Sequence, residues 1–210
     1  MYSPLNETVL SDEYLRTWRL TFVIRHPALA WPSMYRAMVK ISILGMKDDD
    51  GIKGASMTNM SLRWTRMLYD WCMEQPGDPT TPLIMDANDV IHTPESVMRF
   101  CEPAGLDSGS MQFKWGSKVE EKRSQKLVNG TMEGDKGQED IYKKAAAIML
   151  YTLEDSSGIV KNKALANIDV SAEATKWKAE FGEEMGGFIE KAVRDLMPDY
   201  KYLKVRRVTA

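Results

Sequence analysis

Cysteine and histidine are both scarce in this chain of 210 residues, which contains two of each. Cys72 and Cys101 stand in apolar surroundings without the spacing of metal ligands, so we expect two reduced, buried thiols rather than a disulfide. Any mechanism that needs an imidazole base must use His26 or His92. The sequence predicts no metal site.

A long apolar run and an excess of one charge are also missing. The chain has 28 Lys and Arg against 30 Asp and Glu, and this balance argues against nucleic acid or an anionic membrane as the main partner. No apolar run approaches the roughly 20 residues that span a bilayer, and the first residues lack a signal-peptide pattern. We therefore expect a cytoplasmic protein with neither a membrane nor a nucleic-acid partner.

Two local signatures of enzyme sites are missing as well: a Gly-rich phosphate loop and a nucleophile elbow. What the chain does contain is 43% hydrophobic residues and 15 methionines, enough for one domain with a real core. Flexible methionine side chains fill irregular gaps between helices. A Met-rich helical core is the favoured interpretation, and an apolar ligand pocket is the alternative.

Two short apolar runs are typical of strands that are covered on both faces. The first is residues 20–24 (LTFVI), and Pro27 then opens a helix that contains Pro32. The second is residues 82–87 (PLIMDA), and a further helix follows it, with Thr93 as N-cap, Pro94 at its first position and an end near Gly105. A strand, helices, a second strand and more helices indicate an α/β fold with a small parallel sheet and predominantly helical content.

The remaining segments complete the predicted organisation. The polar residues 1–13 predict an N-terminal arm, and residues 14–210 a single domain in which the charged residues 116–139 form a mobile loop. The other segments predict a loop at 48–54, helices at 61–72, 141–153 and 171–197, with Pro198 as a stop, and a solvated basic tail at 200–208.

The first strand ends in the residues best placed for chemistry. Arg25 and His26 follow it directly, at the edge where ligands of parallel sheets bind and where a helix N-terminus presents N–H groups. Arg25 could bind a phosphate or carboxylate, and Ser33 could add a hydroxyl donor. The alternative is that Arg25 pairs with Asp86 or Asp89, after the second strand.

The other polar residues at this edge also have two interpretations. His26 is the candidate proton shuttle, but a histidine beside a proline more often satisfies a backbone group. His92 is a weaker candidate, because it directly precedes a predicted helix cap. Asp86 and Asp89 could form a carboxylate pair, although roles as an N-cap or in a salt bridge are more common.

The run FVIRHPALAWPSMYR resembles the motif by which sulfotransferases hold the 3′-phosphate of their sulfuryl donor, 3′-phosphoadenosine 5′-phosphosulfate (PAPS). By this resemblance Arg25 and Ser33 match the two residues that bind the phosphate. Three later segments are similar to segments of fungal sulfotransferase-like proteins: PLIMDANDVIHTPESVMRFCEPAGL, MQFKW and WKAEFGEEMGGFIEKAVRDLMPDYKYL. The similarity runs from about residue 4 to 208 and implies a truncated form of the family's three-layer fold.

The departures from that family bear on function. Met1 stands close to the 3′-phosphate motif, so the N-terminal strand and phosphate-binding loop of the family, with its lysine, and the usual catalytic histidine are expected to be absent. The C-terminal Gly-rich donor loop is not recognisable either. Sulfuryl transfer depends on stabilising the charge of the moving group, and these parts supply most of that stabilisation.

Three functional hypotheses follow. The first is a small-molecule biosynthetic enzyme of the natural-product type, which catalyses cyclisation, isomerisation or elimination without a cofactor and uses Arg25 and His26. The second is a PAPS-dependent sulfotransferase, present as a fragment or a split chain, that also binds the product adenosine 3′,5′-bisphosphate (PAP). The third is a non-catalytic binding or assembly module. A thin parallel sheet leaves an open edge, so we also expect a homodimer.

Overall fold

The computed structural model describes residues 3–43, 49–75, 81–115, 142–150, 156–160 and 167–209. The chain forms two compact units. The first comprises Met1–Pro32, Met57–Met111 and Lys161–Ala210, and the second comprises Ser33–Ser56 and Gln112–Val160. The predicted mobile loop at 116–139 lies outside the described residues.

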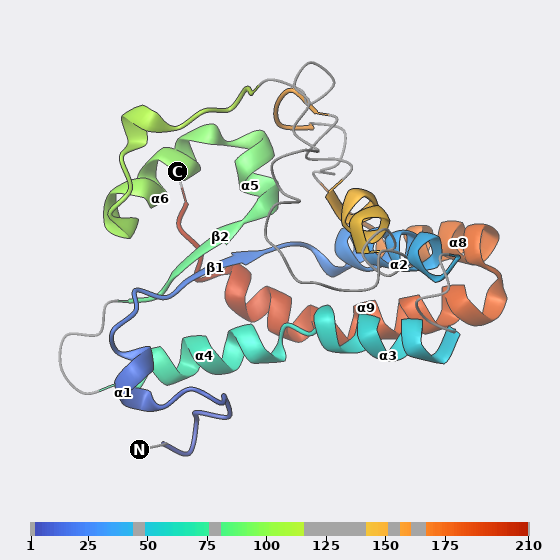
Figure 1. Cartoon of the computed structure of the whole chain (residues 1–210), viewed down its shortest axis with the longest axis horizontal. Helices are drawn as coiled ribbons and strands as arrows, with labels where there is room; N and C mark the ends of the chain where they lie inside the picture. Colours follow the sequence, from blue (N-terminus) through green and yellow to red (C-terminus); the bar gives the residue numbers. More distant parts are fainter. Residues whose placement is uncertain are drawn as a thin grey trace. The chain divides into compact units, whose positions relative to one another are not determined.

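A two-stranded parallel sheet organises the first unit (Figure 1). β1 (Thr21–Ile24) pairs with β2 (Leu83–Asp86) in a register that places Thr21 opposite Leu83 and Ile24 opposite Asp86. Both predicted strands are therefore confirmed, and with them the predicted α/β class with a small parallel sheet and mainly helical content. The β-branched and aromatic residues of β1 suit a pleated, half-buried strand.

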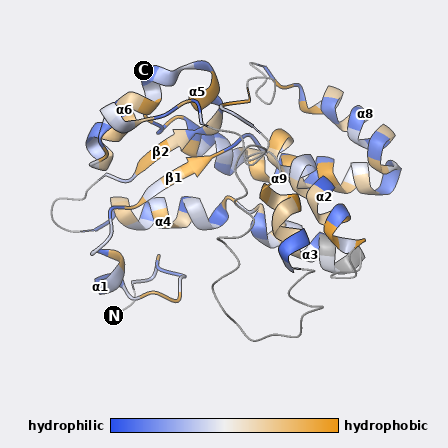
Figure 2. Ribbon diagram, turned by 45° about the horizontal axis from the view of Figure 1, so that its top comes forward, coloured by the Kyte–Doolittle hydropathy of each residue, from blue (hydrophilic) through white to orange (hydrophobic). Residues whose placement is uncertain are grey.

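One face of the sheet packs on α4 (Arg63–Met73) and the C-terminal part of α9 (Glu183–Lys204). Ile24 and Ile84 from the strands are fully buried there, and Figure 2 shows both strands as mainly hydrophobic. Apolar burial on this scale contributes about 1.5–3 kcal/mol per large side chain. The buried members of this cluster are Ile24, Tyr69, Ile84, Tyr200 and Leu203.

The other face is covered over β2 but open over β1. α5 (Ala87–His92) and α6 (Pro94–Ala104) follow β2 and pack on it, and Met85 is buried. Val23, the partner of Met85 in β1, is 73% exposed. An apolar side chain on an uncovered edge strand is a surface that another element or chain can cover.

The start and end of α6 are mostly as predicted. Pro94 is the first residue, and Thr93 is in the N-cap position, but the Thr93 side chain makes no capping hydrogen bond. The helix ends at Gly105, whose φ of 72° lies in the left-handed region that favours glycine. A short 3-10 helix, η1 (Ser108–Ser110), follows.

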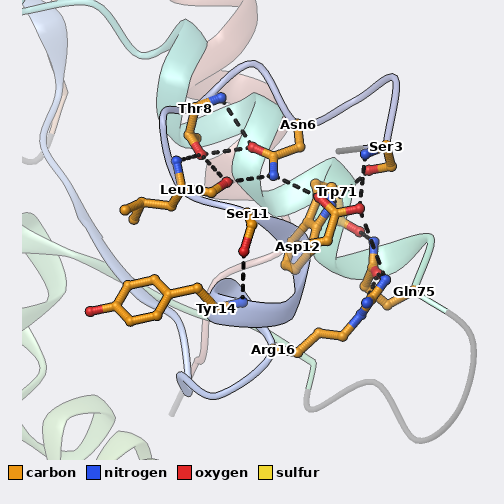
Figure 3. Close-up of polar contacts among 10 residues, drawn as sticks. All are labelled: Ser3, Asn6, Thr8, Leu10, Ser11, Asp12, Tyr14, Arg16, Trp71 and Gln75. Atoms are coloured by element: carbon orange, nitrogen blue, oxygen red, sulfur yellow. Dashed lines mark hydrogen bonds and ion pairs between the residues drawn. The ribbon is translucent and has the colours of Figure 1, made fainter. Parts of the chain in front are cut away.

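The N-terminal segment lies against α4 (Figure 3). Asn6 and Asp12 are buried and joined by a 2.6 Å hydrogen bond, and the indole N–H of Trp71 donates to the hydroxyl of Ser3 at 2.9 Å. Leu15, at the end of α1 (Asp12–Leu15), is buried with Trp71. Apolar packing and buried hydrogen bonds together fix this segment on α4.

Three sequence predictions about helix limits were wrong. Residues 49–54, predicted as part of a loop, lie in α3 (Asp49–Asn59). Residues 171–197, predicted as one helix, instead lie in α8 (Val170–Phe181) and in α9, because Gly182 between them adopts a φ of 86°. Pro198 lies inside α9 and does not end it.

The second unit contains most of α2 (Pro27–Ser42) and the helical residues 142–150. Met38 and Ile41 of α2 are buried there with partly buried side chains that include Ala145 and Ile148. An antiparallel bridge between Lys114 and Gly158 lies in the same unit. Pro27 is the first residue of α2, as the sequence predicts.

Gly186 is required for the packing of α8 against α9. A Cβ at this position would lie 2.5 Å from the Cα of Lys178 and 2.6 Å from its backbone nitrogen, whereas nothing lies within 4 Å of a Cβ at Gly187. We expect Gly186→Ala to lower the free energy of unfolding by about 1–3 kcal/mol through overpacking. Gly187→Ala is the matched control and should raise it by up to about 1 kcal/mol. Urea titrations of both variants measure the difference, and equal stability would contradict the close approach of the helices.

Candidate functional site

The carboxyl ends of β1 and β2 meet at one edge of the sheet. Ile24 and Asp86 are the last paired residues, so the residues that follow the two neighbouring strands start side by side. Arg25 and His26 come after β1 and lead into α2, while Asp86 leads into α5. Arg25, His26 and Asp86 all lie in the first compact unit.

His26 is the N-cap of α2. Its carbonyl oxygen accepts hydrogen bonds from the N–H groups of Leu29 at 2.9 Å and Ala30 at 3.1 Å, and its Nδ1 accepts the N–H of Ala28 at 3.2 Å. A ring nitrogen that accepts a hydrogen bond carries no proton, so neutral His26 carries its proton on Nε2. The predicted backbone-satisfying role of His26 is therefore present, and Nε2 is left as a donor.

The electrostatic surroundings of His26 favour this neutral form. Burial lowers the pKa of His26, and the positive charge of Lys204 lowers it further, whereas the carboxylate of Asp86 acts in the opposite direction. At neutral pH the imidazole is thus uncharged. In this form Nε2 can act as a hydrogen-bond donor.

Asp86 and Tyr200 form a buried hydrogen bond at the same edge. Asp86 has no exposed surface, and one of its carboxylate oxygens accepts from the Tyr200 hydroxyl at 2.6 Å. The other oxygen accepts the N–H of Asn88 at 2.9 Å, which makes Asp86 the N-cap of α5. Burial and the bond to Asp86 both raise the pKa of Tyr200, so the phenol stays protonated and donates. The expected N-cap role of Asp86 is confirmed.

Asp89 is also occupied, so neither acid pairs with Arg25. Nε of Arg207 lies 2.6 Å from a carboxylate oxygen of Asp89. This ion pair confirms the salt-bridge role expected for Asp89. It also shows that residue 207, in the predicted solvated tail, belongs to the folded edge.

Arg25 is the exception among these charged groups. Its side chain is half-buried, and within the described ranges it has no hydrogen bond or ion pair. Burial alone lowers the pKa of its guanidinium, with no contribution from a neighbouring carboxylate. A partly desolvated guanidinium without an anion is unfavourable, so this position favours an anionic ligand.

Sequence reasoning missed two residues of the site, Tyr200 and Lys204. The Tyr200 ring lies 4.9 Å from the His26 ring, centroid to centroid, in an edge-on arrangement, and Nζ of Lys204 lies 5.3 Å from the same Tyr200 ring. Both residues follow Pro198, where the sequence predicted the helix to stop. A Tyr–x3–Lys spacing continued past that proline would have been the only sequence signal.

The other predicted residues are not brought into this edge. Ser33 is exposed on α2 and belongs to the second unit, so its part in the site stays a prediction. His92 is exposed in the last turn of α5. Among the described residues no three His, Cys, Asp or Glu side chains form a metal-binding group, and Cys72 and Cys101 are buried, free thiols. None of the described helices is long and apolar enough to span a membrane.

Comparison with known proteins identifies fungal relatives. The chain is 36% identical to the protein named sulfotransferase ppzF of Metarhizium rileyi (strain RCEF 4871) and 36% identical to the protein of that name from Metarhizium majus (strain ARSEF 297). Each alignment covers the whole chain but 58% of the relative, so the chain spans less than two thirds of their length. No family model and no solved structure matches it.

Two tyrosines of α9 allow a matched test of the buried bond. Tyr200→Phe leaves an oxygen of the fully buried Asp86 without its donor, and should lower the free energy of unfolding by about 1.5–3 kcal/mol. Tyr202→Phe removes a similar bond to Asp70, whose side chain is 32% exposed, and should cost only about 0.5–1 kcal/mol because water replaces the hydroxyl. Denaturant unfolding measures both, and equal losses would show that burial of Asp86 has no energetic consequence.

Proposed function

We propose that the chain is an enzyme of small-molecule biosynthesis, of the natural-product type, which binds an anionic group of its ligand at Arg25. Its similarity to two fungal proteins named sulfotransferase ppzF, 36% identical over 58% of their length, supports an enzyme of the sulfotransferase-like type. The observation that carries the proposal is the half-buried guanidinium of Arg25, which has no protein anion in the described residues. Both nearby acids are used elsewhere, by Tyr200 and Arg207.

We favour the donor-dependent form of this proposal. In it the anion is the 3′-phosphate of PAPS, and a sulfuryl group passes from the donor to a hydroxyl of the small molecule, with PAP as the other product. The name of the Metarhizium relatives supports this form, as does the similarity of the segment around Arg25 to the 3′-phosphate motif. Ser33 would add a second hydrogen bond to the phosphate.

A donor-free form is the second candidate. Here Arg25 binds a carboxylate or enolate of the substrate, and Nε2–H of His26 donates to a developing negative charge during cyclisation, isomerisation or elimination. Its specific support is charge: a PAPS molecule carries several negative charges, whereas Arg25 offers one unpaired guanidinium among the described residues. In this form no cofactor is bound.

Calorimetry with PAP tests the anion site. We expect PAP to bind the unchanged chain and Arg25→Ala to weaken that binding at least about tenfold, the size of one charge-assisted hydrogen-bond pair. Arg19→Ala is the matched control, because exposed Arg19 precedes the opposite end of the same strand. It should leave the affinity within about twofold.

Each result selects one form. No heat with millimolar PAP excludes the donor-dependent form for this chain. The donor-free form is then judged in cells that make the product, where Arg25→Ala should abolish it. Unchanged product levels with Arg25→Ala would exclude the donor-free form too.

We also propose that a second copy of the chain covers the open half of the sheet. Val23 on β1 is 73% exposed, next to an unpaired strand edge in the described residues. Light scattering at micromolar concentration should give twice the mass of one chain, and Val23→Lys should give a single chain. Val205→Lys, at a residue that is 76% exposed at the end of α9, is the control that should remain dimeric. A monomeric unchanged protein contradicts the dimer.

A further inference from the structure

We propose that His26 and Lys204 form a second binding point for an oxyanion of the phosphate type, separate from Arg25. The two side chains come from opposite ends of the chain and meet at one aromatic ring. The expectation that the ligand carries two anionic groups rests on the proposed function. The binding point itself rests on His26, Lys204 and Tyr200.

The Tyr200 ring is the common support of the two donors. His26 lies edge-on to it, with an angle of 66° between the ring planes, and the Lys204 ammonium lies 5.3 Å from its centroid. The hydrogen bond to buried Asp86 fixes the ring. Lys204 follows Tyr200 by one helical turn, so its backbone is fixed by the same helix.

Both donors are unused in the described part of the chain. Nδ1 of His26 accepts the N–H of Ala28, and no acceptor among the described residues bonds the Nε2–H. Lys204 makes no ion pair there, and its contact with the Tyr200 ring leaves its N–H groups available. A neutral imidazole N–H and an ammonium group that both contact the Tyr200 ring are donors suited to an anionic oxygen.

The charges around this pair explain why it is left unsatisfied. Asp86 acts on His26 electrostatically, but its oxygens already accept from Tyr200 and Asn88. Asp89 is held by Arg207. Lys204 disfavours the protonated form of His26, so at neutral pH the two side chains offer one neutral N–H and one ammonium group. An oxyanion would be attracted to both.

Arg25 belongs to a different point of the same edge. Among the described residues Arg25 makes no contact with the Tyr200 ring, which His26 and Lys204 both contact. A ligand that uses both points therefore carries two separate anionic groups. A nucleoside 3′,5′-bisphosphate has that property, and a simple carboxylate does not.

The two histidines of the chain make a direct test available. Imidazole resonances of the full chain are followed by NMR during titration with inorganic pyrophosphate, and exposed His92 serves as an internal reference. We expect a saturable shift of the His26 resonances and no comparable shift of His92. Lys204→Met should weaken this response about tenfold, equivalent to about 1.4 kcal/mol.

Lys201→Met is the matched control, since Lys201 is exposed on the same helix and carries the same charge. It should leave the response within about twofold. A pH titration without ligand adds a second readout. Lys204→Met should raise the pKa of His26, because Lys204 is the cation that lowers it, and Lys201→Met should not. Asp86 acts in the opposite direction on the His26 pKa, and Tyr200 is neutral, so neither accounts for such a rise.

The outcomes separate this inference from the proposed function. No saturable His26 shift, equal shifts of His26 and His92, or equal effects of Lys204→Met and Lys201→Met overturn the inference, even where PAP binds and requires Arg25. A His26 response that requires Lys204 supports it, even where PAP does not bind and the donor-dependent function is excluded.

Discussion

The hydrogen bond between the buried carboxylate of Asp86 and the hydroxyl of Tyr200 is the interaction on which the site depends. A buried carboxylate is tolerated only when its oxygens have donors, and Asp86 has two, Tyr200 and the backbone of Asn88. One residue thus connects the end of β2, the start of α5 and the last turns of α9. Through the Tyr200 ring the same bond positions His26 and Lys204.

That bond requires α9 to continue past Pro198. A proline inside a helix removes one backbone hydrogen bond and costs about 3 kcal/mol. Tyr200 and Leu203, both beyond the proline, are buried against Ile24 and Ile84, and each contributes about 1.5–3 kcal/mol of apolar burial. Tertiary packing of these two side chains therefore offsets the local cost, and the helix extends to Lys204.

The same balance explains what could be predicted from the sequence. Most local signals were reliable: both short apolar runs are strands, Pro27 and Pro94 begin helices, and Gly105 ends one. The exception is the glycine- and aspartate-rich run at 49–54, which was predicted as a loop and lies in α3. The N-cap role of Asp86 was also predictable, because an acid at the end of a strand and directly before a helix is well placed to cap that helix. A salt bridge was the general expectation for Asp89, but its partner Arg207 could not be predicted.

Long-range effects were missed. Pro198 was taken as a stop, and Gly182 was passed over, because their outcomes depend on packing between α8, α9 and the sheet. Tyr200 and Lys204 therefore stayed outside the predicted site. The position of Arg25 and His26 at the sheet edge was predictable, because residues directly after a strand need no tertiary information to be placed there.

The charges at the sheet edge follow from these placements. Each acid is satisfied inside the protein, Asp86 by neutral donors and Asp89 by Arg207, so neither compensates Arg25 or Lys204. Both cations lie at the edge where parallel sheets bind ligands. Among the described residues Arg25 and Lys204 therefore have no protein anion at this edge, although the chain as a whole has a net charge of −2. An anionic ligand there would not compete with Asp86 or Asp89, because each of these acids already has a partner.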